Sequence, residues 1–293
     1  MNIQWYPGHM TKTRRQIEAD LKYVDIVAEI VDARIPAASR NPDIDTICAG
    51  KPRLIVLNRA DQADPAQNRA WGTFFRRQGY EVMETDAKTG KGIKQFSITV
   101  NEALRDQIAR WREKGQVGRP VRAMVVGVPN VGKSSFINKV ARKKSAKTSD
   151  RPGVTRGKQW VNVDSTLDLL DTPGILWPKF EDETTGMLLA FTGAVKDDVM
   201  DVETLGCHFM ALLGDRYPAA LSAYKLAEAP RREEEENNIV YGYRLLELCA
   251  RKRGMRISGG ELDTERMARV LLDEYRGGKL GRFTLEVPQD VGV

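Results

Sequence analysis

The segment GVPNVGKS, residues 127–134, has the spacing G-x-x-x-x-G-K-[ST]. In such a loop, backbone N–H groups and the N-terminus of the following helix surround the phosphates of a nucleotide. We expect Lys133 to reach the β- and γ-phosphate oxygens and Ser134 to bind Mg²⁺ through its hydroxyl. The apolar run before the loop and the helical sequence after it favour a nucleotide site over a glycine-rich turn without a ligand. The expected contacts in this loop are Asn130, Val131, Gly132, Lys133, Ser134 and Ser135.

A second segment, DTPGIL at 171–176, follows another apolar run. Asp171 is expected to hold Mg²⁺ through water, and the N–H of Gly174 to contact the γ-phosphate. Thr155, between the two segments, is expected to close over Mg²⁺ as the switch threonine. In the familiar small GTPases the residue after this D-x-x-G motif is Gln, which orients the attacking water. Ile175 stands there instead, so another group must hold the water.

Guanine is usually selected by N-K-x-D, whose Asp accepts hydrogen bonds from the ring N1–H and the 2-amino group. The closest segment is NRAD at 58–61, in which Arg59 replaces Lys; its stem can lie over the base, although the exchange is not neutral. Asp86-Ala87-Lys88 follows the next apolar run and has the form of a loop whose backbone N–H contacts the guanine O6. An ordinary polar strand end is the alternative, which the pairing of the two segments disfavours. The expected base contacts are Asn58, Arg59, Asp61, Asp86, Ala87 and Lys88.

These motifs occur in a rotated order: base motif, base loop, phosphate loop, switch threonine, D-x-x-G. Rotation is physically tolerable because the termini of compact domains often lie close together on the surface. Its consequence is that the chain after Gly174 leads directly into the C-terminal part, so that nucleotide state and domain orientation are expected to be linked.

The elements that must position these residues alternate between strands and helices, which predicts an α/β fold with a mostly parallel sheet. The expected strands are 25–34, 53–58, 80–85, 121–127, 160–163 and 166–171. The expected helices are 11–22, 66–78, 93–115 and one that begins in GKSSFINKVARK. Later segments, 203–217, 238–254 and 264–278, are helical in period, with a possible edge strand at 282–288. We therefore expect a first domain over 1–200, with a connector at 179–200, and a smaller helical domain over 201–293.

Composition fits a globular protein with an anionic partner. Of 293 residues 41% are hydrophobic and 29% charged, and the net charge is +6 with a pI near 9.1. We expect the three separated cysteines to be buried thiols in a reducing compartment. We also expect a cytoplasmic location and no membrane partner, because the sequence shows no secretory signal, no membrane-spanning run and no lipidation motif. The basic stretches are 142–158, 250–256, and Arg276, Lys279 and Arg282.

The sequence resembles the circularly permuted P-loop GTPases that carry a hydrophobic residue in place of the catalytic Gln, and more narrowly the bacterial ribosome biogenesis GTPase A family. The resembling segments are WYPGHM, DARIPAASRNP, NRAD, GVPNVGKSS, RPGVTRG and DTPGIL, which span the first three-fifths of the chain, with a looser match at GGKLGRF. The resemblance implies a permuted GTP-binding domain, a helical RNA-binding domain and late assembly of the large (50S) ribosomal subunit. Arg59 and Asp86 depart from the family pattern, which puts base affinity in question but not the reaction.

Three substitutes for the missing Gln are open. His9, in PGHM, is a surface-turn imidazole that suits water positioning or proton relay, and the resemblance also points to it; His208 lies in an apolar helical segment. Asn130 matches the asparagine of potassium-dependent relatives, where K⁺ supplies positive charge; a loop-forming role is equally open. Ribosomal RNA or protein could order the switch segments. Four arginines in family-like loops are further candidates, as arginine fingers or as phosphate or RNA contacts: Arg34, Arg40, Arg151 and Arg156.

The sequence thus predicts a GTPase that uses GTP/GDP and Mg²⁺, with K⁺ as an open candidate, and with Lys133, Thr155 and His9 at the reaction centre. The expected partners are a large-subunit precursor and its rRNA, with no DNA, and the expected state is a monomer. The alternatives are an RNA-binding switch with negligible turnover and a small-subunit assembly GTPase. The latter would bring an N-terminal barrel or a cysteine-rich zinc module, neither of which is evident.

Overall fold

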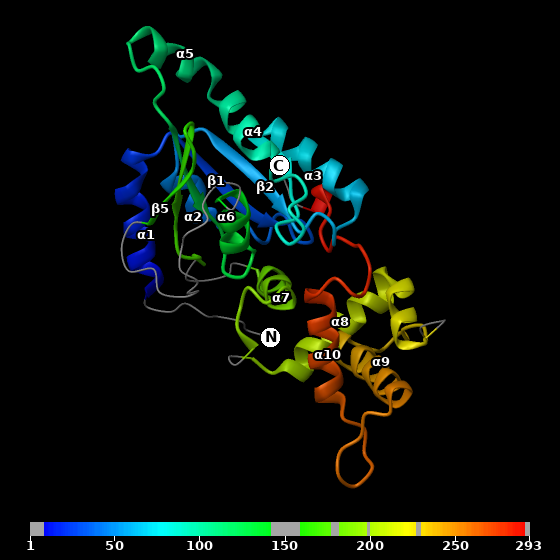
Figure 1. The fold of residues 1–293 in the computed structure, drawn as a ribbon. Coiled ribbons are helices and arrows are strands. Elements are labelled where there is room, and N and C mark those ends of the chain that lie inside the picture. The colour runs from blue at the N-terminus through cyan, green and yellow to red at the C-terminus, as the bar shows by residue number, and fades with distance from the viewer. Residues whose placement is uncertain (1–8, 142–158, 177–181, 198–199, 227–229, 291–293) are drawn as a thin grey trace. The chain divides into compact units, whose positions relative to one another are not determined.

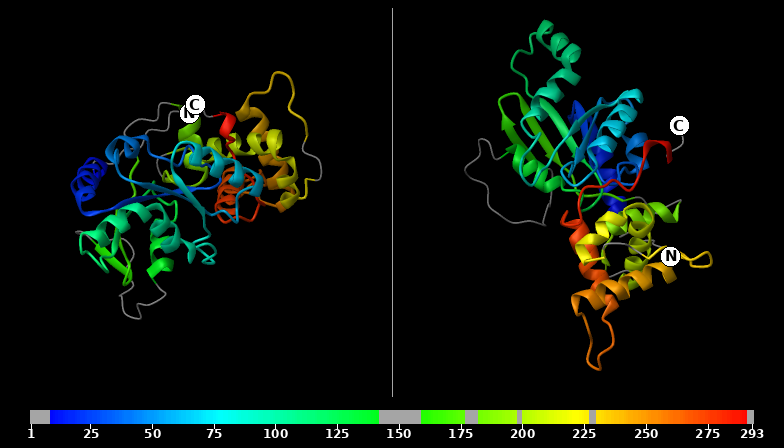
Figure 2. Two further views of the ribbon diagram at one scale, coloured as in Figure 1. Left: turned by 90° about the horizontal axis from the view of Figure 1, so that it is seen from above. Right: turned by 90° about the vertical axis from the view of Figure 1, so that its right-hand side faces the viewer.

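The structure, a computed structural model, describes residues 9–141, 159–176, 182–197, 200–226 and 230–290. Within these ranges the chain forms two compact units (Figure 1; Figure 2). The first contains 9–176 and 284–290, and the second contains 182–283.

The first unit is built on one sheet, whose strand order among the described residues is β3-β2-β1-β4-β6-β5. All neighbouring strands are parallel except β5 and β6. Every residue of β1 and β2 is buried, which explains their nearly continuous apolar sequences. The expected mostly parallel sheet is confirmed. The strands are β1 Ile26–Asp32, β2 Arg53–Asn58, β3 Glu81–Glu84, β4 Val121–Val126, β5 Gln159–Asp164 and β6 Leu167–Asp171.

The strand order creates a switch point between β1 and β4. The chain runs outward from β1 to β2 and β3, and then returns to place β4 on the other side of β1 (Figure 1). In open α/β sheets, ligands bind beyond the carboxyl ends of the strands at such a point. The segment 127–134 follows β4, and the segment 58–61 begins at the end of β2, so the fold directs both motifs to one edge.

The helices of the first unit flank this sheet (Figure 2). They are α1 His9–Asp20, α2 Pro42–Ile47, α3 Pro65–Arg77, α4 Gln95–Ala103, α5 Arg105–Glu113 and α6 Lys133–Ala141, with a 3₁₀ turn η1 at Leu21–Tyr23. The side chains of Asn41 and Asp64 cap α2 and α3, and each is followed by Pro at the first helical position. The single helix expected over 93–115 is instead two, which meet at Leu104 with φ −108° and ψ 13°. Leu104 is buried whereas α5 buries no residue, so the chain bends where packing against the unit ends.

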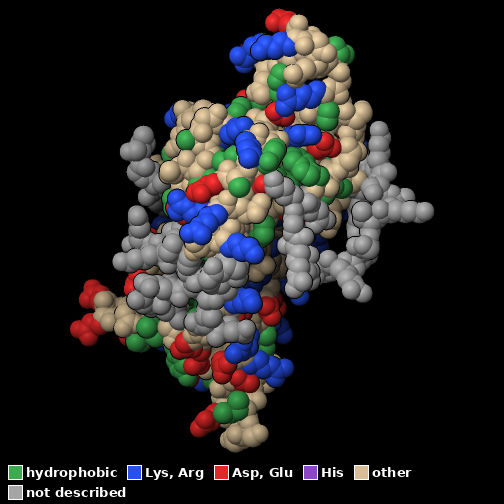
Figure 3. All heavy atoms as spheres, turned by 90° about the vertical axis from the view of Figure 1, so that its left-hand side faces the viewer, with side chains coloured by type: hydrophobic (Ala, Val, Ile, Leu, Met, Phe, Trp, Pro, Cys, Tyr) green, Lys and Arg blue, Asp and Glu red, His purple; other side chains and the backbone are tan. Residues whose placement is uncertain are grey.

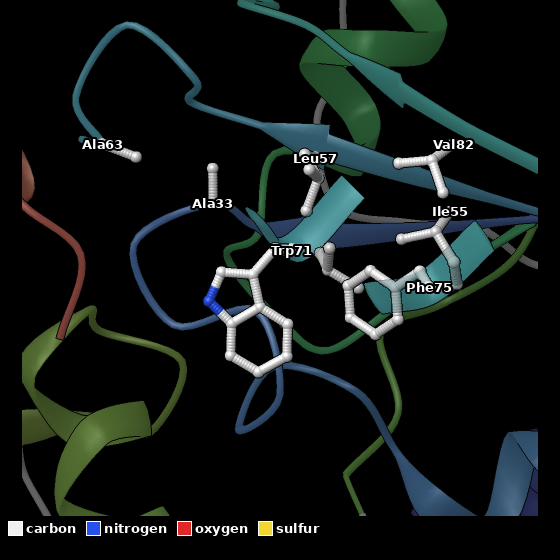
Figure 4. Close-up of a cluster of buried hydrophobic side chains, with 8 residues drawn as sticks. Ala33, Ile55, Leu57, Ala63, Trp71, Phe75 and Val82 are labelled. Atoms are coloured by element: carbon white, nitrogen blue, oxygen red, sulfur yellow. The ribbon is translucent and has the colours of Figure 1, made fainter. Parts of the chain in front are cut away.

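Aromatic side chains of α3 form a core against β1, β2 and β3 (Figure 4). Trp71 is fully buried, and its ring centroid lies 5.4 Å from that of Phe75. These rings cover Ile55 and Leu57 of β2. Truncating an aromatic residue in such a core typically costs about 3–5 kcal/mol. This cluster fixes α3, and with it the loop that joins α3 to β2.

The second unit is helical throughout its described residues, as expected. Its helices are α7 Glu183–Phe191, α8 Val202–Arg216, α9 Asn238–Arg253 and α10 Thr264–Arg276, with a 3₁₀ turn η3 at Pro218–Tyr224. The side chain of Asp263 caps α10 by accepting the N–H of Arg266. A series of aromatic contacts ties the helices together. Phe209 lies tilted against Phe191 and against Tyr275, and Phe283 is stacked on Tyr275 and on Tyr217. Helix α7 was missed because its sequence, ETTGMLLAF, is apolar on several sides and gives little helical period.

The chain end differs from the expectation in two ways. The possible edge strand at 282–288 does not form, since 284–286 bond to a loop and not to a strand, and a 3₁₀ turn, η4 Pro288–Asp290, follows. The boundary of the second domain, expected over 201–293, also differs from that of the compact helical unit, because residues 284–290 belong to the unit that contains the sheet. The cause is a set of hydrogen bonds from this segment to the loop after β1, described below.

Candidate nucleotide site

The phosphate loop between β4 and α6 holds its lysine in a buried position. The Nζ of Lys133 donates to the carbonyl oxygens of Gly127 and Val128, both at 3.1 Å. Burial lowers the pKa of Lys133 to about 8, and the carboxylate of Asp171 opposes that lowering. The ammonium of Lys133 is therefore a buried cation inside the loop, which is the position expected of a lysine that binds phosphate.

The start of α6 leaves its polar groups open to solvent. Ser134 and Ser135, in the first turn, are exposed, whereas Phe136 and Ile137 are buried on the opposite side. The helix therefore presents hydroxyls and unpaired N–H groups at its N-terminus, where a phosphate and its metal would lie.

The base motif is bonded directly to the phosphate loop. The Nδ2 of Asn58 donates to the carbonyl oxygen of Val131 at 2.9 Å, and the guanidinium of Arg59 donates to that of Asn130 at 3.0 Å. Gly132 permits this approach, because a Cβ there would lie 2.4 Å from the Asn58 Nδ2. Two segments more than 70 residues apart thus form one site.

The loop 86–90 completes the base side. The N–H of Ala87 donates to Oδ1 of Asn58 at 3.1 Å, and the Thr85 hydroxyl donates to the same oxygen at 3.3 Å. The carboxylate of Asp86 accepts the N–H groups of Lys88 and Thr89. Burial acts to raise the pKa of Asp86, but these bonds outweigh it and hold the pKa below its usual value. Asp86 therefore shapes the loop.

Asp61 presents an exposed carboxylate with no hydrogen-bond or ion-pair partner among the described residues. It follows the two bridging residues of the motif, Asn58 and Arg59. An exposed carboxylate two residues after Arg59 has the acceptor chemistry that the ring N1–H and 2-amino group of guanine need.

The switch segment after β6 lies against the phosphate loop. A Cβ on Gly174 would lie 2.9 Å from two backbone atoms of Pro129 and 3.0 Å from Nζ of Lys133, so a side chain does not fit. Ile175 is 1% exposed, and its N–H donates to the carbonyl oxygen of Gly127 at 3.2 Å. Burial raises the pKa of Asp171, opposed by Lys133. Ile175 is thus packed into the protein, with no group that could hold water.

The comparisons with known proteins agree with this site. Residues 122–206 match the family described as "50S ribosome-binding GTPase". The chain is 46% identical to the ribosome biogenesis GTPase A of Priestia megaterium, over 99% of this chain and 98% of that protein. It is 30% identical to the protein of the same name from Thermotoga maritima, over 99% of this chain and 96% of that protein.

The chain belongs to the ribosome biogenesis GTPase A family. Membership makes it a GTPase with a role in ribosome assembly, which uses guanine nucleotide and, as this class does, Mg²⁺. Its fold agrees with a GDP-bound structure of YlqF, with a TM-score of 0.65, 28% identity and coverage of 94% of this chain and 100% of that one. The crystal structure of GNP-bound YlqF from T. maritima gives the same TM-score over 96% of this chain. The expected circularly permuted GTPase fold is confirmed.

Two arginines that the sequence offered as fingers have structural roles in this GTPase. Arg34 is fully buried and paired with Asp32 at 2.7 Å. Arg40 is paired with the buried Glu29 at 3.2 Å and with Asp45 at 2.6 Å. Because carboxylates hold both guanidinium groups inside the unit, the interpretation of Arg34 and Arg40 as fingers is wrong.

Other expected residues lie outside the description. Thr155, Arg151 and Arg156 are not among the described residues. His9 is described as the first residue of α1, without its side chain. His208 is half-buried on α8, and all three cysteines are buried and free, as expected. No helix within the described ranges combines the length and apolar character needed to cross a membrane.

Sequence reasoning missed Asp32, the last residue of β1. Its buried carboxylate is held by Arg34 and lies 3.7 Å from Nε of Arg59. Burial acts to raise the pKa of Asp32, but the two arginines outweigh it and keep the pKa below its usual value. The signal that could have identified Asp32 is its position, because it is an acidic residue at the carboxyl end of a buried strand. Asp32 enters the sequence-based expectations only within the segment DARIPAASRNP.

Proposed function

We propose that this GTPase acts in late assembly of the large ribosomal subunit, binds its rRNA in the GTP state and leaves on hydrolysis. The observation that carries the proposal is the bonded contact of the base motif with the phosphate loop in a chain of this family. The matched family, described as 50S ribosome-binding, supports the large subunit as partner.

In this proposal the nucleotide and its metal bind the exposed polar groups of the site. Lys133 pairs with the β- and γ-phosphates, and Ser134 and Asp171 hold Mg²⁺, directly and through water. The N–H of Gly174 contacts the γ-phosphate, and Thr155 closes over the metal. The metal, when bound, neutralises the developing phosphate charge.

The water is positioned by His9, with K⁺ at Asn130 in support. Two features favour this arrangement. Ile175 is buried and has no polar side-chain atom, and Asn130 has a backbone φ of 57° that turns the loop beside the phosphates. His9 begins α1, whose next residue, Met10, is buried, so the helix is anchored immediately after the imidazole.

We propose the helical domain, expected over 201–293 and compact over 182–283, as the main RNA-contacting part of the molecule, and the sheet-containing unit as the GTPase domain. Arg251, Lys252 and Lys279 are exposed, and Lys225, Lys252 and Arg253 line a surface hollow. Cations of this kind bind phosphate backbones with strong salt dependence. On the face drawn in Figure 3, basic and acidic side chains are interspersed in the described parts, so charge alone defines no single patch there.

Arg276, one of the basic residues noted in the sequence, has partners within the protein. Arg276 pairs with Asp197 at 2.7 Å and donates to the carbonyl oxygens of Ala190 and Phe191 at 2.9 and 3.1 Å. It therefore closes the C-terminal end of α7, where a cation is favourable, and it is half-buried in that role.

The test is GTP turnover with and without purified large ribosomal subunits, in K⁺ and in Na⁺, for the wild type and His9→Ala. We expect low turnover alone, faster turnover with subunits, and loss of the stimulation in His9→Ala. Flat turnover in all conditions would instead support the alternative, a GTP-dependent binding switch with negligible hydrolysis. Sedimentation with subunit precursors in GDP or a non-hydrolysable GTP analogue tests the switch itself, because equal sedimentation in both would exclude it.

A further inference from the structure

The segment Thr284–Glu286, here termed the strap, holds the loop after β1. The carboxylate of Glu286 accepts the N–H groups of Ala37 at 2.8 Å and Ala38 at 3.0 Å. The backbone carbonyl oxygen of Glu286 accepts the indole N–H of Trp71 at 3.2 Å. Figure 4 shows the indole nitrogen on the side of the ring away from Phe75. Two amides on one carboxylate form charge-assisted bonds that fix the loop's position.

The other two strap residues bond to the loop after β1 and to Asp64, which follows the base motif 58–61. The N–H of Leu285 donates to the carbonyl oxygen of Arg34 at 2.7 Å. The hydroxyl of Thr284 accepts the N–H of Asp64 at 3.2 Å and donates to the carbonyl oxygen of Ala33 at 3.4 Å. Thr284 and Leu285 are 2% and 3% exposed, so water does not replace these partners.

From the strap, a continuous set of polar contacts reaches the phosphate loop. Arg34, whose carbonyl the strap holds, donates from Nε and Nη2 to Asp32 at 2.9 and 2.7 Å. The carboxylate of Asp32 lies 3.7 Å from Nε of Arg59, and Nη2 of Arg59 donates to the carbonyl oxygen of Asn130 at 3.0 Å. Each contact joins residues of the first compact unit. A displacement of the loop after β1 would therefore shift the side chain of Arg59, which replaces the usual lysine of the base motif.

We infer that the strap is a positioning element of the guanine site, in which Thr284 and Glu286 hold the base motif in register with the phosphate loop. Neither residue touches the nucleotide in this scheme. Thr284 acts through Asp64 and Ala33, and Glu286 acts through Ala37 and Ala38, so that together they hold the loop after β1, which carries Arg34. The inference rests on the guanine site of the GTPase and not on its ribosomal partner. It is tested with the full chain and nucleotide alone, so its failure leaves the proposed assembly role unaffected.

The sharpest test compares Thr284→Val with Thr284→Ser. Valine keeps the shape and loses the hydroxyl, whereas serine keeps the hydroxyl. We expect GDP to dissociate at least about fivefold faster from Thr284→Val, the low end of coupling between linked sites. Thr284→Ser should stay within about twofold of wild type. The rates are measured by displacement of a fluorescent GDP in stopped flow.

Base selectivity separates positioning from a general loss of stability. We expect Glu286→Gln, which retains one acceptor oxygen, to bind GDP less tightly and to lose part of the preference for GDP over inosine diphosphate, which lacks the 2-amino group. Gln289→Ala, at an exposed residue of η4 three positions after the strap, should leave both affinities unchanged. Wild-type dissociation rates and wild-type selectivity in folded Thr284→Val and Glu286→Gln would overturn the inference.

Discussion

At the residue scale, the buried ammonium of Lys133 determines how nucleotide binding depends on pH. In the free protein its pKa lies at about 8 because of burial. A bound phosphate raises that pKa, since a nearby anion favours the charged form. Binding is therefore linked to protonation. Below pH 8 the lysine is already charged and affinity should be flat, whereas above pH 8 affinity should fall, by up to about tenfold per pH unit.

This dependence is measured as the equilibrium affinity for fluorescent GDP between pH 6.5 and 9. Lys133→Met, assayed at higher nucleotide concentration, should bind weakly and show no such decline in this window. An equal decline in the variant would assign the pH dependence to another group. Circular dichroism at each pH checks that the fold is retained.

Asp32 offers a second test at this scale, because it is the buried partner of two arginines. Removing one partner of a buried ion pair typically costs about 3–5 kcal/mol, since the other charge is left uncompensated. We expect Asp32→Asn to lower the free energy of unfolding by that order. Urea unfolding of the nucleotide-free protein measures it.

The matched control for Asp32 is the surface pair Glu265–Arg269 on α10, whose side chains are 61% and 55% exposed. Glu265→Gln should change the free energy of unfolding by less than about 1 kcal/mol, as exposed pairs do. Similar losses in the two variants would show that Asp32 is not held as a buried ion pair.

At the scale of elements, hydrophobic pattern predicted most of the sheet. Strand β2 was expected at its observed bounds, 53–58, and β4 and β6 to within one residue. Strand β2 is buried on both faces, and β4 and β6 are buried at most positions, so their apolar runs are unambiguous. The base and phosphate motifs could likewise be placed, because each follows such a strand and parallel strands end at one edge.

What the sequence could not show are features set by long-range contacts. RFTLEVP alternates as a strand does, yet Leu285 and Glu286 bond to the loop after β1 and to Trp71 and do not pair with an edge strand of the sheet. The break at Leu104 depends on where packing ends, which periodicity does not report. The pairing of Asp32 with Arg59 joins two strand ends whose proximity follows only from the strand order.

The switch segment gives a prediction at this scale. Gly174→Ala would place a methyl group 2.9 Å from Pro129 and 3.0 Å from Lys133, closer than side chains pack. The segment must move away from the phosphate loop, so its N–H should no longer reach a γ-phosphate. We expect binding of a non-hydrolysable GTP analogue to weaken by about tenfold, a loss of about 1.4 kcal/mol, while GDP binding changes less.

Isothermal titration with the two nucleotides measures the effect of Gly174→Ala. Equal losses for GDP and for the analogue would place the disturbance in the phosphate loop as a whole, and would remove Gly174 from the γ-phosphate role.

At the scale of the whole molecule, the chain passes from the GTPase unit into the helical unit and back again. The first crossing follows the switch segment, as the permuted order predicts. The second lies between Phe283, stacked on Tyr217 and Tyr275, and Thr284, the first residue of the strap. The helical unit is thus continuous in sequence with the switch segment at one end and with the strap at the other.

If the helical unit carries the RNA contacts, its exposed cations should control subunit binding without altering the nucleotide site. We expect the double variant Arg251→Glu with Lys252→Glu to weaken sedimentation with large subunits, and to reduce the slope of log affinity against log salt by about 1–2, roughly one for each lost phosphate contact. Its affinity for GDP should equal that of wild type. Arg105→Glu, a reversal at an 86% exposed site on α5 of the other unit, serves as the control and should leave the slope unchanged. An unchanged slope in the double variant would show that the RNA contacts do not lie at the C-terminal end of α9.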